Sequence, residues 1–204
     1  MKNPGFFILF MSLSICSYSQ EYVYYHFLSS RIKAKIYLVE TIQQGTQYYY
    51  YRNGQKEIEA DYKDGILDGK YLEWYTSGQI RTIGNFRNGR RNGQWTHYFK
   101  DGKTELQEYY VDDTIDDYRL EYYKNGQMKL KCYFVMGMLE GPYCTWFDTG
   151  IKKEEGKLLN GAKEGLWTEW YFNGQKRSET LYGKGVILGP PRRWWSTGRV
   201  DEGY

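Results

Sequence analysis

Aromatic, small polar and glycine positions recur along this chain every 24 residues. Each copy carries two adjacent aromatic residues, one variable residue, one small polar residue and a glycine. A fixed period of about 20–50 residues, held over three or more copies, is typical of stacked supersecondary units that share a core. The seven glycines are Gly54, Gly78, Gly102, Gly126, Gly150, Gly174 and Gly198. The first aromatic column is Tyr50, Trp74, Tyr98, Tyr122, Trp146, Trp170 and Trp194, and the second is Tyr51, Tyr75, Phe99, Tyr123, Phe147, Tyr171 and Trp195.

The spacing inside each copy predicts two strands. The small polar residue and its glycine, as in Asn53, suit a tight turn at the tip of a hairpin. A second glycine pair, as in Gly65 with Gly69, marks a connecting loop. The stretches between these turns are short for helices, and apolar residues such as Ile58 and Tyr62 are an even number apart, as on one face of a strand. We therefore expect an all-β fold, an elongated antiparallel β-hairpin meander forming an open repeat solenoid, with about 14 strands spanning about 65 Å.

The two aromatic columns should face opposite sides of this sheet. With a two-residue type I′ turn at each tip, the second column shares a face with Ile58 and the first lies on the other face, beside charged residues such as Glu57, Arg81 and Lys129. Large rings in register along a sheet shield one another and the backbone. Packing is the expected role of the second column, and the first column is the candidate binding surface.

The N-terminal stretch differs from the repeats. Residues 1–19 combine one lysine, an apolar run of about ten residues and small residues before Gln20, which is typical of a secretory signal and too short to span a membrane. Cys16 leaves lipidation open as an alternative to simple export. Residues 20–44 have the length of one more copy and are expected to form a degenerate capping repeat, with Ser30 in the glycine column. Residues 45–204 form the repeat array.

Composition and charge argue against two classes of function, nucleic-acid binding and catalysis. Lysine and arginine total 28 against 25 acidic residues, a net charge of +3, and the signs alternate along the chain. A nucleic-acid binder would carry a strong basic stripe, so no nucleic acid is expected as a partner. His26 and His97 occupy different repeat columns with no catalytic companion nearby, and both are expected on the surface. We expect no enzyme activity and no cofactor.

Two local features allow other chemistry. Asp112, Asp113, Asp116 and Asp117 form a cluster in the copy where aspartate replaces both loop glycines, and they are weak candidates for a calcium site. One period earlier the loop carries Arg87, Arg90 and Arg91, so ion pairs across stacked loops are the structural alternative, and on this view there is no metal site. Cys132 and Cys144 flank a connecting loop, where export would permit a disulfide; two unbridged thiols are the alternative.

The recurring pattern resembles a known family. The segments "GKYLEWYTSGQIRTIGNFRNGRRNGQW" and "GPYCTWFDTGIKKEEGKLLNGAKEGLWTEWYFNGQKRSE" resemble the bacterial variant of the MORN repeat, over residues 45 to 204. The resemblance implies seven hairpin repeats without catalysis and a role in protein scaffolding or phospholipid contact; some bacterial members are antitoxins. Two positions depart from the pattern, because Arg119 and Pro191 stand in a column that elsewhere holds aromatics such as Trp95 and Trp167.

These observations converge on an exported scaffold, periplasmic, cell-surface or secreted after cleavage near Ser19. The expected activity is protein–protein interaction through an aromatic-rich sheet. The alternatives are a module that binds glycan, cell wall or lipid headgroups, or the antitoxin of a toxin–antitoxin pair. A secretory signal conflicts with neutralising a cytosolic toxin, which disfavours the last.

Overall fold

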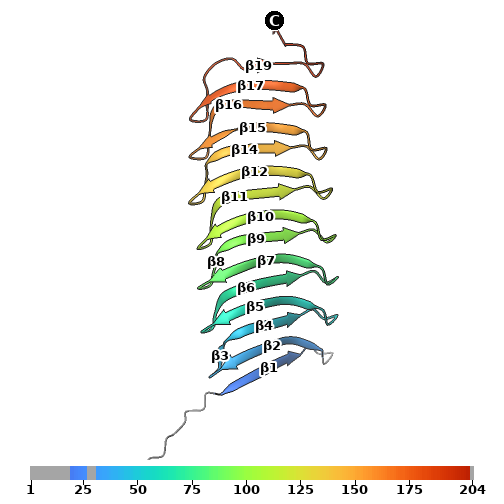
Figure 1. Cartoon of the computed structure of the whole chain (residues 1–204), viewed down its shortest axis with the longest axis vertical. Helices are drawn as coiled ribbons and strands as arrows, with labels where there is room; N and C mark the ends of the chain where they lie inside the picture. The colour runs from blue at the N-terminus through green and yellow to red at the C-terminus, as the bar shows by residue number, and fades with distance from the viewer. Residues whose placement is uncertain (1–18, 27–30, 203–204) are drawn as a thin grey trace, which may run out of the picture.

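The computed structural model describes residues 19–26 and 31–202, and these form a single open antiparallel sheet. Successive hairpins lie side by side along the long axis, with the first described strand at one end and the last at the other (Figure 1). The all-β hairpin meander predicted from the sequence is confirmed. The predicted signal, residues 1–19, lies outside the described residues except for Ser19, as does Ser30 of the predicted cap.

Fourteen strands of six to nine residues make up most of the sheet, and five two-residue strands complete it in the described part of the chain. The longer strands are β1 (Gln20–His26), β2 (Ile32–Val39), β4 (Gly45–Tyr50), β5 (Lys56–Lys63), β6 (Ile66–Trp74), β7 (Ile80–Arg87), β9 (Gly93–Tyr98), β10 (Thr104–Val111), β11 (Thr114–Tyr122), β12 (Met128–Val135), β14 (Gly141–Trp146), β15 (Lys152–Leu159), β16 (Ala162–Trp170) and β17 (Lys176–Gly183). The short ones are β3 (Ile42–Gln43), β8 (Arg90–Arg91), β13 (Met138–Leu139), β18 (Val186–Ile187) and β19 (Arg192–Arg193).

Four of the short strands are interrupted starts of the strands that follow them. β2 pairs first with β3 and then with β4, and β7 pairs first with β8 and then with β9. β1 and β2 pair with each other and extend the sheet at the N-terminal end. Counting each interrupted strand once, about fifteen levels at about 4.8 Å give a sheet about 67 Å long.

The hairpin tips use a different turn from the one predicted. The backbone N–H of Gly54 donates to Tyr51 O (2.9 Å), the N–H of Tyr51 donates to Gln55 O (2.8 Å), and Gly54 has a φ of 91°. This is a three-residue loop with a left-handed glycine, not the two-residue type I′ turn. All seven column glycines have this hydrogen bond and a positive φ. Glycine is needed here because other L-residues are strained in this region.

A bulge beside each tip settles which residues share a face. Tyr50 pairs with Lys56 whereas Tyr49 pairs with Ile58, so Glu57 is the extra residue of the return strand. The second aromatic column does share a face with Ile58, as predicted. The charged column was placed wrongly: the Arg81 guanidinium lies 5.8 Å from the ring of Tyr75, on the face of the second column. The prediction failed because it assumed a return strand without a bulge.

The connecting loops carry the two-residue turns with paired positive φ values. Asp64 and Gly65 have φ values of 52° and 80°, and Asp112 and Asp113 have 48° and 68°. Asparagine and aspartate enter this region more readily than other side chains, so Asp113 replaces a loop glycine without breaking the hairpin. The N–H of Gly65 donates to Gln43 O (2.9 Å), which joins the loop to the preceding repeat.

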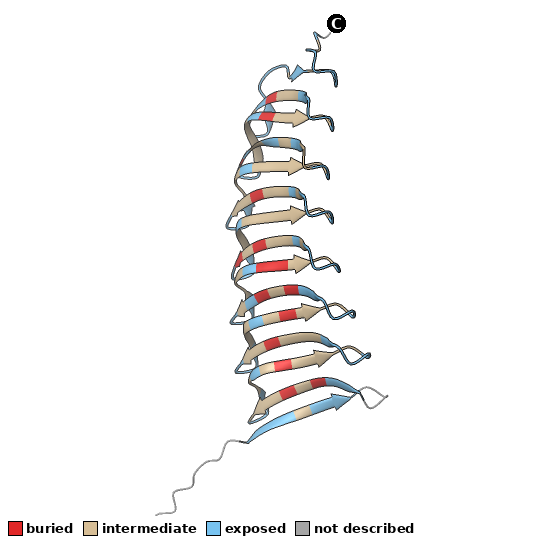
Figure 2. Cartoon of the chain, turned by 45° about the vertical axis from the view of Figure 1, so that its right-hand side comes forward, coloured by how far each residue is buried: buried red, intermediate tan, exposed pale blue. Residues whose placement is uncertain are grey.

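The sheet has two faces, each named for one of its residues. The Trp95 face carries Trp95, Tyr71, Trp167 and the second aromatic column, and the Trp74 face carries the first aromatic column. On the Trp95 face the most buried residues form a stripe that crosses the strands, visible as red segments near the middle of successive hairpins in Figure 2. Members of this stripe include Ala60, Gly84, Trp95, Glu108, Cys132 and Trp167. Each repeat therefore completes its core with its neighbours.

Candidate functional site: a groove along the second aromatic column

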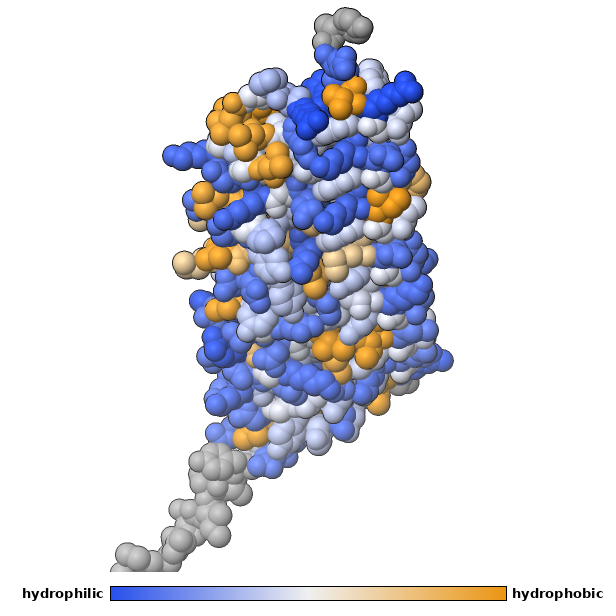
Figure 3. All heavy atoms as spheres, turned by 45° about the horizontal axis from the view of Figure 1, so that its top comes forward, coloured by the Kyte–Doolittle hydropathy of each residue, from blue (hydrophilic) through white to orange (hydrophobic). Residues whose placement is uncertain are grey.

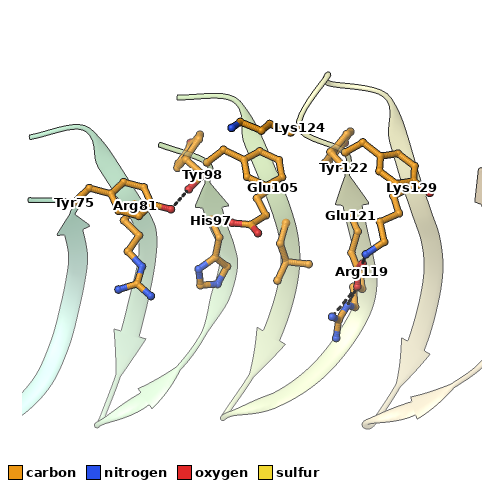
Figure 4. Close-up of a pocket in the computed structure, with 13 residues that line it drawn as sticks. Tyr75, Arg81, His97, Tyr98, Glu105, Arg119, Glu121, Tyr122, Lys124 and Lys129 are labelled. Atoms are coloured by element: carbon orange, nitrogen blue, oxygen red, sulfur yellow. Dashed lines mark hydrogen bonds and ion pairs between the residues drawn. The ribbon is translucent and has the colours of Figure 1, made fainter. Parts of the chain in front are cut away.

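A groove lies on the Trp95 face, between the central stripe and the hairpin tips. It has a volume of about 590 Å³ and crosses three repeats. Rings of Tyr75, Phe99 and Tyr123 line it at intervals of one repeat. Figure 4 shows these strands side by side, with Arg81 close to the ring of Tyr75 and Arg119 close to Glu121. The groove therefore runs along the stack, across the strands.

A ladder of tyrosine hydroxyls borders the groove. The hydroxyl of Tyr75 donates to the carbonyl of Tyr98 in the next repeat (2.6 Å). The same bond joins Tyr51 to Trp74, Tyr123 to Trp146, and Tyr171 to Trp194. Phe99 has no hydroxyl, so the carbonyl of Tyr122 lacks the phenol donor that the corresponding carbonyls accept. The interruption at Phe99 lies inside the groove.

Paired charges form the floor of the groove. Arg119 lies 2.7 Å from the carboxylate of Glu121 and 3.4 Å from that of Glu108, and Lys129 reaches Glu121 at 3.0 Å. Ion pairing with Lys129 and Arg119 holds the pKa of Glu121 below its usual value even though burial acts to raise it. Arg81 pairs with Glu73 at 2.9 Å in the same way. The floor therefore carries both signs of charge, in ion pairs.

Glu108 and Arg119 explain one departure from the repeat pattern. Glu108 stands in the column of Gly84 and Gly156, and Arg119 in the column of Trp95 and Trp167, where each glycine faces an indole. In this copy a nearly buried carboxylate and a guanidinium replace the glycine and the ring. Glu108 also accepts a hydrogen bond from the hydroxyl of Tyr110 (2.8 Å). The two substitutions thus compensate each other, because the buried Glu108 carboxylate needs the positive charge of Arg119 and a hydrogen-bond donor.

His97 is less exposed than predicted. It is half-buried in the groove wall, and the Oγ1 of Thr82 lies 3.2 Å from its Nδ1. Burial lowers the pKa of His97, while Glu108 and Glu105 act in the opposite direction. The Thr82 hydroxyl donates to Glu73 (3.1 Å) and is almost inaccessible. A threonine, a histidine and a carboxylate therefore meet, but a substrate could not reach the hydroxyl. His26 is exposed, as predicted.

A smaller groove continues the first. It has a volume of about 260 Å³ and shares Glu121, Tyr123 and Lys129 with the larger one. Lys153 and Tyr143 belong to its lining. Together the two hollows extend along several repeats of the Trp95 face.

The predicted binding surface, the first aromatic column, lies on the opposite face. All seven of its residues, Tyr50, Trp74, Tyr98, Tyr122, Trp146, Trp170 and Trp194, are half-buried. Lysine side chains lie over three of the tryptophan rings: Lys56 over Trp74 at 5.3 Å, Lys152 over Trp170 at 5.8 Å and Lys176 over Trp194 at 5.7 Å. These cation–π contacts shield rings that were expected to be open. Its role in binding remains a prediction.

The aspartate cluster is engaged with the preceding loop. Arg87 pairs with Asp112 and Arg91 with Asp113, both at 3.1 Å. Backbone and side-chain hydrogen bonds from Arg91 lower the pKa of Asp113. Asp116 instead accepts a hydrogen bond from the N–H of Met136 (2.9 Å), and Asp117 has a φ of 72° in the place of a loop glycine. Two of the predicted arginine–aspartate pairs are confirmed, and the described residues contain no group of three or more His, Cys, Asp or Glu arranged to hold a metal.

The two cysteines do not form the disulfide that was considered. Lys131 pairs with Cys144, so Cys132, one residue further along its strand, points to the other face of the sheet. Both thiols are free, and burial raises the pKa of each to about 11. The alternative of two unbridged thiols is the correct one.

The comparisons with known proteins agree with the fold. A family model described as the MORN repeat variant matches residues 43–64, 67–88, 91–112, 118–136 and 163–184. These matches cover slightly more than half of the chain. The chain belongs to the MORN repeat variant family. No curated protein matches it. MORN repeats are generally modules that interact with proteins or membranes, and the family is typically non-enzymatic.

Sequence reasoning missed the groove. Its signals were present in the sequence: Phe99 and Phe147 lack the hydroxyl that four tyrosines of the second column carry, and Arg119 places a charge in an aromatic column. Neither signal could be interpreted from the sequence alone, because the bulge decides which charged residues lie on the same face as the rings.

Proposed function

We propose that this MORN-repeat chain is a non-enzymatic scaffold that binds a partner protein through the groove on the Trp95 face. The observation that carries the proposal is the groove itself, which crosses three repeats and is lined at regular intervals by Tyr75, Phe99 and Tyr123. A long shallow trough with repeating rings suits a segment of another protein. An enzyme would need an enclosed site with a reachable nucleophile, and Thr82 beside His97 is buried.

Export is part of the same proposal. The first 19 residues have the composition of a cleavable signal, which would release a mature chain that begins at Gln20. Within the described residues no helix is long and apolar enough to cross a membrane. Sequencing the N-terminus of protein recovered from the periplasm or medium tests this. A start at Gln20 or nearby supports export, whereas an intact Met1 in the cytosol contradicts it.

The binding proposal is tested by affinity capture from an extract of the producing cells with matched variants. Lys124→Glu reverses a charge that lines the groove, and Lys70→Glu makes the same change on another exposed lysine outside it. We expect a stoichiometric partner retained by the wild type and Lys70→Glu and reduced with Lys124→Glu. Equal retention by all three contradicts groove binding.

Sedimentation with purified peptidoglycan and with liposomes separates the other classes. If the protein co-sediments with either one and no protein partner is found, the result contradicts the scaffold proposal and supports glycan or lipid-headgroup binding. Neither is expected, because ion pairs balance the charges of the groove floor and lysines lie over three tryptophans of the Trp74 face. Binding of the wild type to peptidoglycan that is weakened in the Lys124→Glu variant would likewise contradict the proposal.

A further inference from the structure

The ring spacing of the groove restricts what can lie in it. Tyr75, Phe99 and Tyr123 are separated by one repeat each, which is two strands of the sheet. Neighbouring strands are about 4.8 Å apart, so equivalent rings recur about every 9.6 Å along the groove. A chain lying along the stack contacts successive rings in the same way only if its own repeat matches this length.

Regular backbone conformations differ in how closely their axial repeat matches the ring spacing. A polyproline II helix advances about 3.1 Å per residue and about 9.3 Å per three-residue turn, within about 0.3 Å of the ring spacing. Two turns of an α-helix advance about 10.8 Å, which adds an error of about 1.2 Å at every repeat. A β-strand advances about 10 Å in three residues, but its side chains alternate in direction, so successive rings would meet opposite faces of the ligand. Polyproline II alone stays in phase.

The polar groups of the groove fit the same ligand. A polyproline II segment has no internal hydrogen bonds, so its carbonyls remain free to accept them. Arg81, Arg119, Lys124 and Lys129 line the groove, and their ion pairs leave donors over, because a guanidinium has five N–H groups and an ammonium has three. Their charges are matched by Glu73, Glu105, Glu108 and Glu121, so the groove offers donors without a large net charge. Such a site favours an uncharged segment over a polyanion.

The interruption of the tyrosine ladder adds one specific requirement. The carbonyl of Tyr122 lacks the phenol donor that Tyr75 supplies to the carbonyl of Tyr98. A backbone N–H of the ligand can occupy that place. Proline has no N–H, so the ligand would carry a residue other than proline at the Phe99 level.

We propose that the groove binds a proline-rich segment of a partner protein in the polyproline II conformation. About six residues span the three rings from Tyr75 to Tyr123, with a residue other than proline donating its N–H to the carbonyl of Tyr122. The proposal rests on the scaffold function above and names the kind of segment that the scaffold takes.

Fluorescence anisotropy with synthetic peptides on the full-length protein tests it. The probe is a labelled nine-residue peptide of three Pro-Pro-Ala repeats, compared with a Gly-Ser peptide of equal length and a helical Ala-Glu-Lys peptide. We expect saturable binding of the proline-rich probe, at least about tenfold tighter than the other two. Equal affinity for the proline-rich and Gly-Ser probes, or tighter binding of the helical probe, overturns the proposal.

Two variants with the same chemical change test the register. Phe99→Tyr supplies the missing hydroxyl inside the groove, and Phe147→Tyr makes the same change at a position outside it. Loss of one hydrogen bond corresponds to a decrease of about fivefold in affinity, so Phe99→Tyr should weaken the probe by that factor and Phe147→Tyr by less than twofold. Equal effects of the two variants contradict the register. If affinity capture retains a groove-dependent partner while the proline-rich probe fails, the scaffold function stands and this inference fails; if no partner is captured, the scaffold function fails.

Discussion

The indole of Trp95 lies directly against the backbone of Gly84 on the neighbouring hairpin. A Cβ atom placed on Gly84 would stand 2.3 Å from the ring, far inside van der Waals contact. Gly156 and Trp167 repeat the arrangement at the same distance. A glycine in one repeat thus makes room for a ring of the next, and this is how a single sheet buries large aromatic residues without a second layer of structure.

Gly84→Ala should therefore destabilise the protein. The methyl group forces the Trp95 ring out of its place, and overpacking of this kind costs about 1–3 kcal/mol. Urea unfolding measures the change. Gly189→Ala is the matched control, because a Cβ at Gly189 meets no atom within 4 Å. Equal midpoints for Gly84→Ala and Gly189→Ala would refute the packing described for Trp95.

Two substitutions in the tyrosine ladder, in adjacent repeats, should change the free energy of unfolding in opposite directions. Tyr75→Phe removes the bond to the carbonyl of Tyr98 and should lower the free energy of unfolding by about 0.5–1.5 kcal/mol. Phe99→Tyr creates the equivalent bond to Tyr122 and should raise it by a similar amount. Urea denaturation measures both changes, with one common dependence of the unfolding free energy on urea concentration fitted to all variants. A Tyr75→Phe variant as stable as the wild type would show that this hydroxyl contributes nothing to the stack.

The Glu108–Arg119 pair should behave as a unit. Arg119→Trp alone leaves the buried Glu108 carboxylate without its cation. Because Arg119 is partly exposed, we expect a cost of about 2 kcal/mol, below that of a fully buried pair. Adding Glu108→Gly recreates the glycine and indole seen at Gly84 and Trp95, so the double variant should recover most of that loss. Thermal unfolding of the two single variants and the double variant gives the coupling free energy. Additive losses would mean that the two positions do not compensate each other.

His97 predicts a pH dependence. Burial lowers its pKa in the folded state below the usual 6.5, so the unfolded chain binds the proton more tightly. The free energy of unfolding should therefore fall as pH decreases through about 6.5 and stop falling below the folded-state pKa. His97→Gln should remove this slope between about pH 7.5 and pH 6, a range in which ordinary carboxylates stay ionised. Chemical denaturation at several pH values measures it, and a slope that persists in His97→Gln would assign the effect to other groups.

The repeat pattern predicted the parts of the fold that depend on local sequence. Glycine at Gly54, the aspartates that replace loop glycines and the stacked arginine–aspartate pairs all follow from a residue's own conformational preference or from its place one period away. These features need only the period and the preferences of turn residues. They can therefore be predicted from the sequence alone.

Properties that depend on register were not accessible in the same way. One extra residue in the return strand moved Arg81 from the predicted face to the other, and the separation of Cys132 from Cys144 follows from side-chain alternation once the pairing is known. The burial of His97 depends on strands on either side of it. The groove combines all of these effects, so it appeared only in the assembled sheet.

Small-angle X-ray scattering of the purified protein tests the central claim, that each hairpin depends on its neighbours in one extended sheet. A sheet about 67 Å long predicts a radius of gyration of about 21 Å and an elongated distance distribution. A compact globule of this size would have a radius of gyration of about 16 Å. The first result supports the stacked array, and a value near 16 Å with a symmetric distribution would contradict it.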